Sequence, residues 1–408
     1  MPGKPGPRSR PAKASASPSP TASLDAFAAD KLRSLDARGL RRRLAVTDRS
    51  AAARAGREDR QLVSFSCNDY LGLSHDPRVV EASIDATRRY GAGAGAARLI
   101  TGNHPLYRAL EARLAELKGT AQAVVFGSGY LANVGILPVL AGPRDVIVMD
   151  ELCHSCLVSG AALSRARVEK FRHNDADDAR RIVESVRRDH RHCLLVTEGV
   201  FSMDGDVAPL PELAELAARH DAWLMTDDAH ALGVIGGGRG SAHAFDPKVD
   251  VPLAMGTLSK AAGAYGGYVC TSEPVAELIR NRARSFVYST GLPPGVVAAA
   301  TAALDIIATE PERVRAPLEH ARRFTAALDL PAAESAIVPI VLGDAERALA
   351  ASAALERHGF LVAAIRPPTV PLGTARLRFA FSAAHRTEDV LAAAAAVAPL
   401  LTRMNATR

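Results

Sequence analysis

The sequence predicts an α/β protein with a doubly wound, mostly parallel sheet and a smaller α+β domain at the carboxyl end. Between residues 104 and 271, short apolar runs alternate with amphipathic helical stretches. This order is typical of a parallel sheet that helices cover on both faces. The pattern changes after Pro294, where a long helical stretch leads into three further apolar runs. Because the pattern changes at this point, we expect one large and one small domain. No internal repeat is present.

The individual elements follow from these runs. Helices are expected at residues 77–90, 105–117, 175–188, 210–219 and 295–308, with another that begins at Leu131. Strands of the large sheet are expected at residues 121–126, 146–149, 168–171, 193–197, 223–226, 253–257 and 267–271. Strands of the small domain are expected at residues 336–342, 361–364 and 376–381.

Four segments are expected along the chain: a leader (1–23), an N-terminal arm (24–70), a large domain (71–294) and a small domain (295–408). The leader is rich in Pro, Ser, Ala and Gly and lacks the apolar centre of a secretory signal. Its composition favours a disordered segment over an organellar transit peptide. The arm begins with apolar residues at roughly helical spacing, namely Leu24, Phe27, Leu32, Leu35 and Leu40.

Charge and composition exclude several classes of function. The net charge is +6, but the leader carries four basic residues and no acid, which leaves the body near neutrality. The body has no basic stripe with interleaved aromatics, so no nucleic-acid partner is expected. Five cysteines, few and odd in number, favour a reducing compartment such as the cytoplasm over a disulfide framework. No apolar run approaches the ~18 residues of a membrane span, so no membrane contact is expected.

A glycine-rich stretch, residues 91–102, superficially matches the dinucleotide pattern G-x-G-x-x-A. In a Rossmann turn this pattern follows a strand and opens a helix, whereas here a helix precedes it. We therefore expect a flexible active-site loop rather than a nucleotide site.

Reactive side chains follow three of the predicted strands. In open α/β sheets, ligands bind beyond the carboxyl ends of the strands, so these side chains are expected to line one crevice. They are Ser202 and Asp204 after strand 193–197, Asp227 and His230 after strand 223–226, and Lys260 after strand 253–257.

Lys260 is the residue around which this crevice is organised. The small residues 261–264 leave room around it, and desolvation would lower the pKa of its amine and make it a nucleophile. Residues 127–129 lie between a strand and a helix start, where free N–H groups favour a phosphate. An amine, a carboxylate, a histidine and a phosphate cradle together suit pyridoxal phosphate (PLP).

Several stretches of the chain match one known family. They are Asn68–Leu73, Thr197–Asp206, Asp227–His230, Ser259–Lys260 and Ile365–Pro371. On these stretches the chain resembles the PLP-dependent α-oxoamine synthases, from roughly Leu24 to the C-terminal region. The resemblance implies a fold-type I PLP-dependent transferase with a seven-stranded large domain, and a homodimer with the active site at the subunit interface.

The stretch Ile365–Pro371, with residues 373–378, is similar to the branch of this family that acts in biotin biosynthesis. That branch implies an acyltransferase that condenses L-alanine with pimeloyl-CoA or a pimeloyl-carrier protein, with loss of CO2. Another α-oxoamine synthase, such as a 2-amino-3-ketobutyrate CoA ligase or a 5-aminolevulinate synthase, is the alternative. A non-enzymatic scaffold that keeps the fold is the third hypothesis.

The resemblance also implies roles for residues around the cofactor. Lys260 would hold PLP as a Schiff base and later remove the Cα proton, and Asp227 would pair with the pyridinium nitrogen. His230 and Ser202 would bond the phenolic oxygen, and His154 would stack on the ring. The residues implied in phosphate binding are Gly129, Tyr130 and Thr257, with Thr290 from a partner subunit, and Ser128 belongs to the predicted cradle.

Arginines are implied in substrate binding. Arg378 would clamp the amino-acid carboxylate, although Arg376 lies on the same face of the expected strand and is not excluded by spacing. Arg366 and Arg41 are the candidates for the far carboxylate of a dicarboxylic acyl chain. Ala97 stands where relatives often carry a serine, which is a departure from the family pattern.

Simpler readings exist for several of these residues. Asp227 and His230 have the spacing of half a metal site, but no further ligands cluster near them in the sequence, and no metal is expected. Cys153 and Cys156 form a C-x-x-C pair that is also found in redox and zinc sites. Without a second pair, ordinary packed cysteines around a functional His154 are favoured. Arg366 precedes two prolines and is also suited to capping a loop.

Overall fold

A computed structural model describes residues 20–42, 44–57 and 59–405. The chain divides into two units, Met1–Val46 and Thr47–Arg408, and each is described by itself. Most of the predicted leader, residues 1–23, lies outside the described residues.

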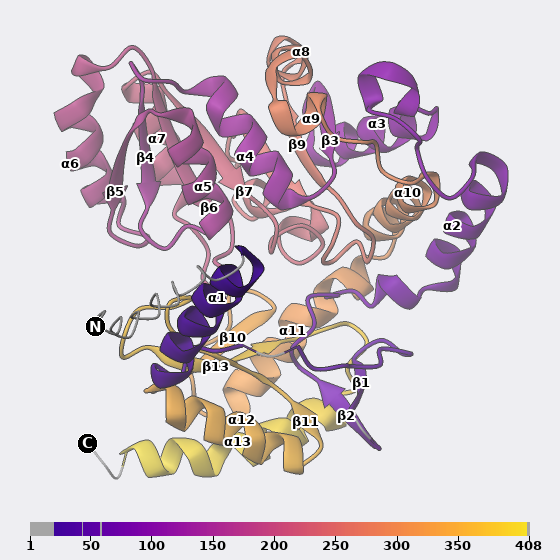
Figure 1. Cartoon of the computed structure of the whole chain (residues 1–408), viewed down its shortest axis with the longest axis vertical. Coiled ribbons are helices and arrows are strands. Elements are labelled where there is room, and N and C mark those ends of the chain that lie inside the picture. The colour runs from indigo at the N-terminus through magenta and orange to yellow at the C-terminus, as the bar shows by residue number, and fades with distance from the viewer. Residues whose placement is uncertain (1–19, 43, 58, 406–408) are drawn as a thin grey trace, which may run out of the picture. The chain divides into compact units, whose positions relative to one another are not determined.

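The first unit contains helix α1 (Pro20–Ala37), which agrees with the helix expected at the start of the arm (Figure 1). None of the residues of α1 is buried. Its apolar side chains Leu24, Phe27 and Leu32 are 65%, 60% and 40% exposed.

The second unit is built around a seven-stranded sheet, as predicted (Figure 1). The spatial order is β3-β9-β8-β7-β6-β4-β5, and only β9 runs antiparallel to its neighbours. Each strand lies within two residues of its predicted bounds. The strands are β3 (Gln122–Phe126), β4 (Val146–Asp150), β5 (Arg167–Phe171), β6 (Cys193–Glu198), β7 (Ala222–Asp227), β8 (Leu253–Thr257) and β9 (Gly267–Thr271).

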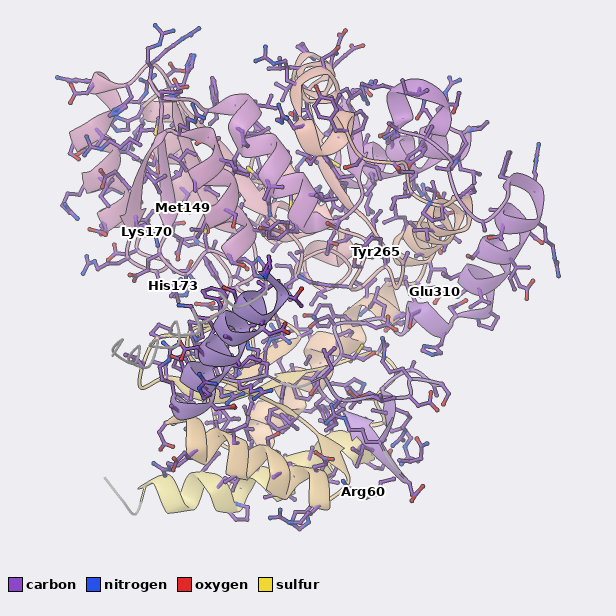
Figure 2. All side chains as sticks on the ribbon, viewed as in Figure 1. Arg60, Met149, Lys170, His173, Tyr265 and Glu310 are labelled. Atoms are coloured by element: carbon purple, nitrogen blue, oxygen red, sulfur yellow. The ribbon has the colours of Figure 1, made fainter. Side chains whose placement is uncertain are left out.

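Both faces of this sheet are buried, which explains why its strands are continuously apolar. In β4, Val146 and Val148 belong to one hydrophobic core, and Ile147 and Met149 (labelled in Figure 2) belong to the core on the opposite face. Side chains alternate along a strand, so each central strand supplies both cores.

Helices pack on these two faces or on one another. The segment α5 was not predicted, because its small and apolar residues, SCLVSGAALS, give no amphipathic period. The helices are α2 (Pro77–Tyr90), α3 (Leu106–Lys118), α4 (Gly129–Leu140), α5 (Ser155–Ser164), α6 (Ala176–Val186), α7 (Leu210–Arg219), α8 (Glu273–Arg282), α9 (Arg284–Val287) and α10 (Pro294–Thr309).

The C-terminal part folds around a third core that includes Phe65, Phe324, Phe379 and Phe381. Its sheet has the antiparallel order β10-β13-β12. Its strands are β10 (Ile337–Gly343), β12 (Ala363–Ile365) and β13 (Ala375–Ala380), and its helices are α11 (Pro311–Ala327), α12 (Ala345–Arg357) and α13 (Thr387–Asn405).

The single strand expected at residues 361–364 is in fact two strands in different sheets. Strand β11 (Phe360–Leu361) pairs in parallel with β2 (Arg60–Ser64), which pairs in turn with β1 (Arg54–Arg57). Strand β12 starts two residues later and pairs with β13. Val362, between the two strands, is buried at 1% exposure, so the apolar run gives no sequence signal for the break.

The glycine-rich stretch 91–102 ends in a π-helical turn, Arg98–Gly102, and Ala97 forms an isolated antiparallel bridge with Thr290. A Cβ atom at Gly102 would lie 2.0 Å from the carbonyl oxygen of Ala96, so this turn requires glycine. None of the helices in the described ranges has the length and hydropathy of a membrane span.

Candidate active site

The candidate site lies at the carboxyl ends of β6, β7 and β8. The register of the sheet places Glu198, the last residue of β6, beside Asp227, the last residue of β7. Asp227 pairs on its other side with Met255 of β8, five residues before Lys260. Three consecutive parallel strands thus bring these side chains to one edge, where the sequence predicted Asp227 and Lys260 but not Glu198.

Lys260 is held by a tight turn after β8. The N–H of Gly263 donates to the carbonyl oxygen of Lys260 at 2.9 Å. Gly263 has a φ of 61°, and a Cβ atom there would lie 2.2 Å from the backbone nitrogen of Ser74. The glycine therefore permits the close approach that places the lysine. Burial lowers the pKa of Lys260 to about 8, although Asp227 and Glu198 oppose this effect.

His230 contacts the lysine directly. Its Nε2 lies 2.8 Å from Nζ of Lys260, and its Nδ1 lies 2.6 Å from the hydroxyl of Tyr70. Burial, with the charges of Lys260 and Arg378, lowers the pKa of His230, so the imidazole is neutral. Tyr70 is fully buried. It lies in the motif Asn68–Leu73, but its role as the partner of His230 was not predicted.

Asp227 is a buried carboxylate with two hydrogen-bond donors. The side-chain nitrogen of Asn133 donates to its Oδ2 at 2.7 Å, and the N–H of Ala229 donates to its Oδ1 at 2.9 Å. Asn133 lies on α4, 94 residues away in sequence, and was not predicted. A buried carboxylate held in this way is suited to face a cationic partner.

Glu198 is a further acidic group that the sequence analysis did not select. Its Oε1 accepts from the N–H of His154 at 2.7 Å, and its Oε2 accepts from the N–H of Ser202 at 3.2 Å. Burial and the neighbouring Asp227 raise the pKa of Glu198 to about 8. One carboxyl group therefore fixes the backbone of two predicted site residues. Glu198 lies within the motif Thr197–Asp206, so the sequence contained the information that could have identified it.

His154 caps the N-terminus of α5. Its Nδ1 accepts from the N–H of Cys156 at 3.2 Å and lies 2.9 Å from the sulfur of the same residue. Burial lowers the pKa of His154, and Lys260 contributes to this effect, while Asp227 opposes it. Although the ring packs against these groups, His154 remains accessible to solvent, so a ligand can reach it.

The predicted phosphate residues gather at the start of α4. Ser128 caps this helix, and its hydroxyl accepts from the N–H of Leu131 at 3.1 Å. A Cβ atom at Gly129 would lie 3.3 Å from Cβ of Thr257, so the end of β8 adjoins the helix start. Tyr130 is 51% exposed beside them. Free N–H groups at a helix start, with hydroxyl groups nearby, are the donor set that a phosphate requires.

The two arginines of β13 have different surroundings. Arg376 forms an ion pair with Asp204 and donates to the carbonyl oxygens of Thr374 and Met203 at 3.0 and 3.2 Å. Asp204, predicted as a reactive residue, is thus paired away from Lys260. Both arginines are almost fully buried, at 4% and 6% exposure.

Arg378 instead reaches residues of the motif Asn68–Leu73. It donates to Oδ1 of Asn68 at 3.1 Å and to the hydroxyl of Tyr70 at 3.4 Å, and its Nε donates to the carbonyl oxygen of Ser202. Since Tyr70 contacts His230, the contacts run from Arg378 to Lys260.

Three predicted residues are not part of this cluster. Thr290 is exposed and lies in the backbone bridge with Ala97. Arg366 is partly buried in the segment after β12. Arg41 belongs to the first unit, where its guanidinium donates to Asp36 at 2.6 Å.

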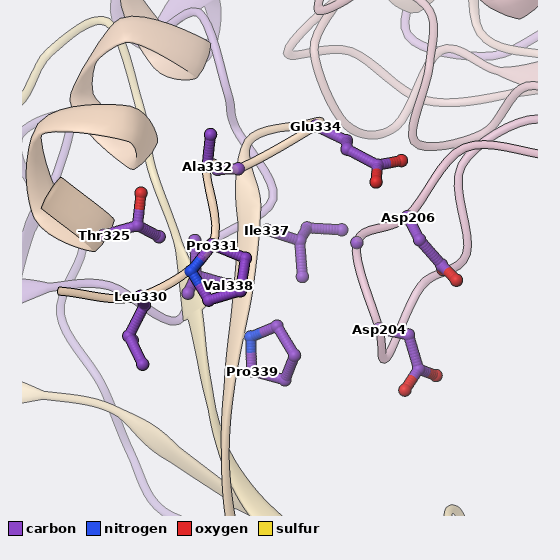
Figure 3. Close-up of a pocket in the computed structure, with 12 residues that line it drawn as sticks. Asp204, Asp206, Thr325, Leu330, Pro331, Ala332, Glu334, Ile337, Val338 and Pro339 are labelled. Carbon is purple, nitrogen blue, oxygen red and sulfur yellow. The ribbon is translucent and has the colours of Figure 1, made fainter. Parts of the chain in front are cut away.

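Two cavities lie near these elements. One of about 420 Å³ has Lys260 in its wall, with polar neighbours that include Ser66, Asn68, Asp69 and Ser259. The other, of about 250 Å³, is lined by the acidic residues Asp204, Asp206 and Glu334 and contains none of the predicted cofactor residues (Figure 3). The cavity beside Lys260 is therefore the one adjacent to the predicted chemistry.

The residues present fit PLP. An amine with a lowered pKa, a buried carboxylate, a neutral histidine and a helix start with hydroxyl groups match the aldehyde, the ring nitrogen, the phenolic oxygen and the phosphate of that cofactor. Within the described ranges, no three His, Cys, Asp or Glu side chains gather as metal ligands.

Comparisons with known proteins agree with this assignment. A family model described as "Aminotransferase class I and II" matches residues 60–397. The chain is 59% identical over 384 residues to an 8-amino-7-oxononanoate synthase of Methylorubrum extorquens (strain PA1), covering 94% of this chain and 98% of the relative. It is 57% identical to the enzyme of the same name from Beijerinckia indica, with 93% and 98% covered. A serine palmitoyltransferase from S. paucimobilis, solved with bound PLP, matches with a TM-score of 0.86 at 29% identity, over 94% of this chain and 100% of that chain.

Proposed function

We propose which residues carry the reaction of this chain, from the premise of its family. The chain belongs to the class I and II aminotransferase family and, within it, to the PLP-dependent α-oxoamine synthases. It is a PLP-dependent acyltransferase of the 8-amino-7-oxononanoate synthase type, in biotin biosynthesis. The reaction joins L-alanine to a pimeloyl thioester and releases 8-amino-7-oxononanoate, CO2 and a free thiol. The observation that carries the proposal is the contact of Lys260, with its lowered pKa, with His230 beside Asp227.

Four residues would hold and orient the cofactor. The amine of Lys260 would bind its aldehyde carbon, and Asp227, fixed by Asn133, would pair with the ring nitrogen. His230 and Ser202 would bond the phenolic oxygen. Bound PLP supplies a ring that withdraws electrons from the carbon next to the amino group.

The phosphate would lie at the start of α4, against Ser128, Gly129, Tyr130 and Thr257. Each of the first two N–H groups of a helix is free to donate, and the helix dipole favours the negative charge. Thr290 of a partner subunit would complete this site in a homodimer, and the bacterial cytoplasm is the proposed location.

Proton transfer is assigned to Lys260. Because burial lowers the pKa of its amine to about 8, a useful fraction is unprotonated near neutral pH and can take the Cα proton of alanine. His154 would cover one face of the ring and exclude water from it. A neutral His230 bonds both Lys260 and Tyr70 without adding a charge.

Arg378 is the proposed clamp for the carboxylate of L-alanine. Its contacts lead through Tyr70 to His230, whereas the guanidinium of Arg376 is engaged by Asp204. Arg366 and Arg41 remain the proposed residues for the far carboxylate of the pimeloyl chain. Pimeloyl-CoA and a pimeloyl-carrier protein are both proposed donors.

Reduction of the purified protein with borohydride tests the central claim. We expect the cofactor label on the peptide that contains Lys260 after proteolysis. A label on another peptide, or none, would contradict the assignment.

A second assay tests the substrates. Purified protein is incubated with L-alanine and pimeloyl, succinyl or acetyl thioesters, and free thiol and CO2 are measured. We expect the pimeloyl thioester to be preferred and Arg366→Ala to weaken that preference. A wild-type preference for succinyl- or acetyl-CoA would assign the chain to another α-oxoamine synthase.

A further inference from the structure

The C-x-x-C pair, Cys153 and Cys156, has no place in the mechanism above. Both cysteines are free and buried. They differ in their surroundings, because the sulfur of Cys153 lies near backbone groups, among them the carbonyl oxygen of Val196 at 3.9 Å. The sulfur of Cys156 lies between two polar side chains of the candidate site.

The first of these side chains is Asn133, which is fully buried on α4. Its side-chain nitrogen has two hydrogens and donates to Oδ2 of Asp227 at 2.7 Å and to the sulfur of Cys156 at 3.1 Å. The opposite orientation of the amide would place its oxygen against a carboxylate. The direction of both hydrogen bonds is therefore fixed by Asp227.

The second side chain is the imidazole of His154. Because the sulfur of Cys156 accepts from Asn133, its own hydrogen is free to donate to Nδ1 of His154, 2.9 Å away. Burial, with Asp227, raises the pKa of Cys156 to about 12, so the thiol keeps that hydrogen. The N–H of Cys156 donates to the same Nδ1 at 3.2 Å.

Two donors thus converge on one ring nitrogen. A nitrogen that accepts from a backbone N–H and a thiol has no hydrogen of its own, so the hydrogen of a neutral imidazole must be on Nε2. The positive end of the α5 dipole lies at the same place and opposes a second proton.

We propose that Cys156 is a positioning residue, whose thiol links His154 to Asp227 through Asn133 and holds the imidazole in its neutral Nε2–H form. The functional part of this inference rests on the proposed roles of Asp227 and His154. If Asp227 contacts the ring nitrogen of PLP and His154 contacts the ring face, one chain of hydrogen bonds positions both side chains. A change at Cys156 would then alter how the ring is seated, without removing any group that touches it.

Nuclear magnetic resonance of the chain purified without cofactor tests the inference. The histidines are labelled with 15N, and His154→Gln assigns the signal of interest. We expect the Nε2–H pattern for His154 in the wild-type chain and in Cys156→Ser, since a hydroxyl also accepts and donates. In Cys156→Ala we expect a mixture of the two neutral forms.

Cys153→Ala is the matched control, because it removes a buried thiol of the same motif whose hydrogen bond is to the carbonyl oxygen of Val196 and not to the His154 ring. Its His154 signal should be that of the wild type. An Nδ1–H pattern in the wild type, or the same spectrum for Cys156→Ala and the wild type, would overturn the proposal. This readout needs no bound cofactor, so it stands apart from a failure of the proposed function.

Circular dichroism of the cofactor band supplies the second readout. With PLP bound, Cys156→Ala should lose at least half of the visible signal per unit of absorbance, and Cys156→Ser should retain it. The value of kcat should fall about tenfold in Cys156→Ala, with KM for L-alanine within twofold. An unchanged visible signal in Cys156→Ala would contradict the link between this thiol and the ring.

Discussion

Two lysines, the buried Lys118 and the half-buried Lys260, show how this protein treats the same charged group in two ways. Lys118, whose side chain is 2% exposed, forms an ion pair with Asp228 and donates to the carbonyl oxygen of Arg239 at 2.7 Å. Asp228 also accepts from the hydroxyl of Ser241. Lys260 instead contacts a neutral histidine, and none of the ion pairs of the described residues includes it.

The difference arises at two adjacent residues, Asp227 and Asp228. Asp228 neutralises Lys118 in direct contact, whereas Asp227 is hydrogen-bonded to Asn133 and acts on Lys260 only through its field. A lysine in contact with a carboxylate is stabilised as a cation, but one that is desolvated without such a partner gives up its proton more readily. The ion pair of Lys118 with Asp228 stabilises the fold, whereas the desolvated amine of Lys260 is suited to the proposed reaction.

Removal of the reactive amine should give the largest effect. Lys260→Ala is expected to lower kcat by at least about 10⁴-fold, because it removes the nucleophile and the proposed base together. The free energy of unfolding should not fall near neutral pH, because no ion pair is broken and the cost of holding a desolvated amine is removed. Steady-state kinetics and chemical denaturation measure the two quantities, and substantial turnover would refute the mechanism.

Removal of the structural lysine should reverse this pattern. Lys118→Met is expected to lower the free energy of unfolding by about 3–5 kcal/mol, because Asp228 is left buried without its partner. The variant Lys118→Met/Asp228→Asn removes the unpaired charge and should recover part of that loss. If the single variant is as stable as the wild type, Lys118 has no structural role and the contrast between the lysines fails.

His173 extends the comparison to a third cation. His173 lies just beyond the carboxyl end of β5 and is labelled in Figure 2. Its ring bridges Asp150 at 3.1 Å and Asp206 at 2.8 Å. Burial opposes its charge, but the two carboxylates raise its pKa to about 10 from an ordinary 6.5. The stability that it contributes is complete below pH 6.5 and is lost as the pH rises through 10.

His173→Gln should therefore cost about 2–3 kcal/mol at pH 7, with a smaller loss at pH 10.5. Denaturation at the two pH values measures this difference. His190→Gln is a matched control, because that ring contacts the carbonyl oxygen of Val186 and no carboxylate. An equal loss for His173→Gln at both pH values would contradict a charged imidazole.

The smallest expected effect is a shift in one titration. In the chain without cofactor, reaction of Lys260 with an acylating reagent should increase with pH around a midpoint near 8, instead of the ordinary 10.5. Because the unfolded chain keeps this proton up to 10.5, the contribution of Lys260 to stability should rise between pH 8 and 10.5. Peptide mapping after brief acylation measures the midpoint, and a value near 10.5 would show that the lysine is not desolvated.

The sequence by itself determined the succession of strands and helices along the large domain. It also determined which side chains gather at the carboxyl edge of the sheet. Strands buried on both faces are continuously apolar, and helices between them require a parallel sheet. Residues that follow such strands must meet at the carboxyl edge, which brings Asp227, His230 and Lys260 together. No other part of the chain is needed for that inference.

Only the tertiary structure decided which residues support these groups. Asn133 lies on an apolar helix and reaches Asp227 across 94 residues, and Arg378 reaches Tyr70 across 308 residues. Alternation places Arg376 and Arg378 on the same face of β13, so the loops that pack against that face choose between them. Periodicity records which face of an element is buried, but the partner across the interface depends on packing between segments that are distant in sequence.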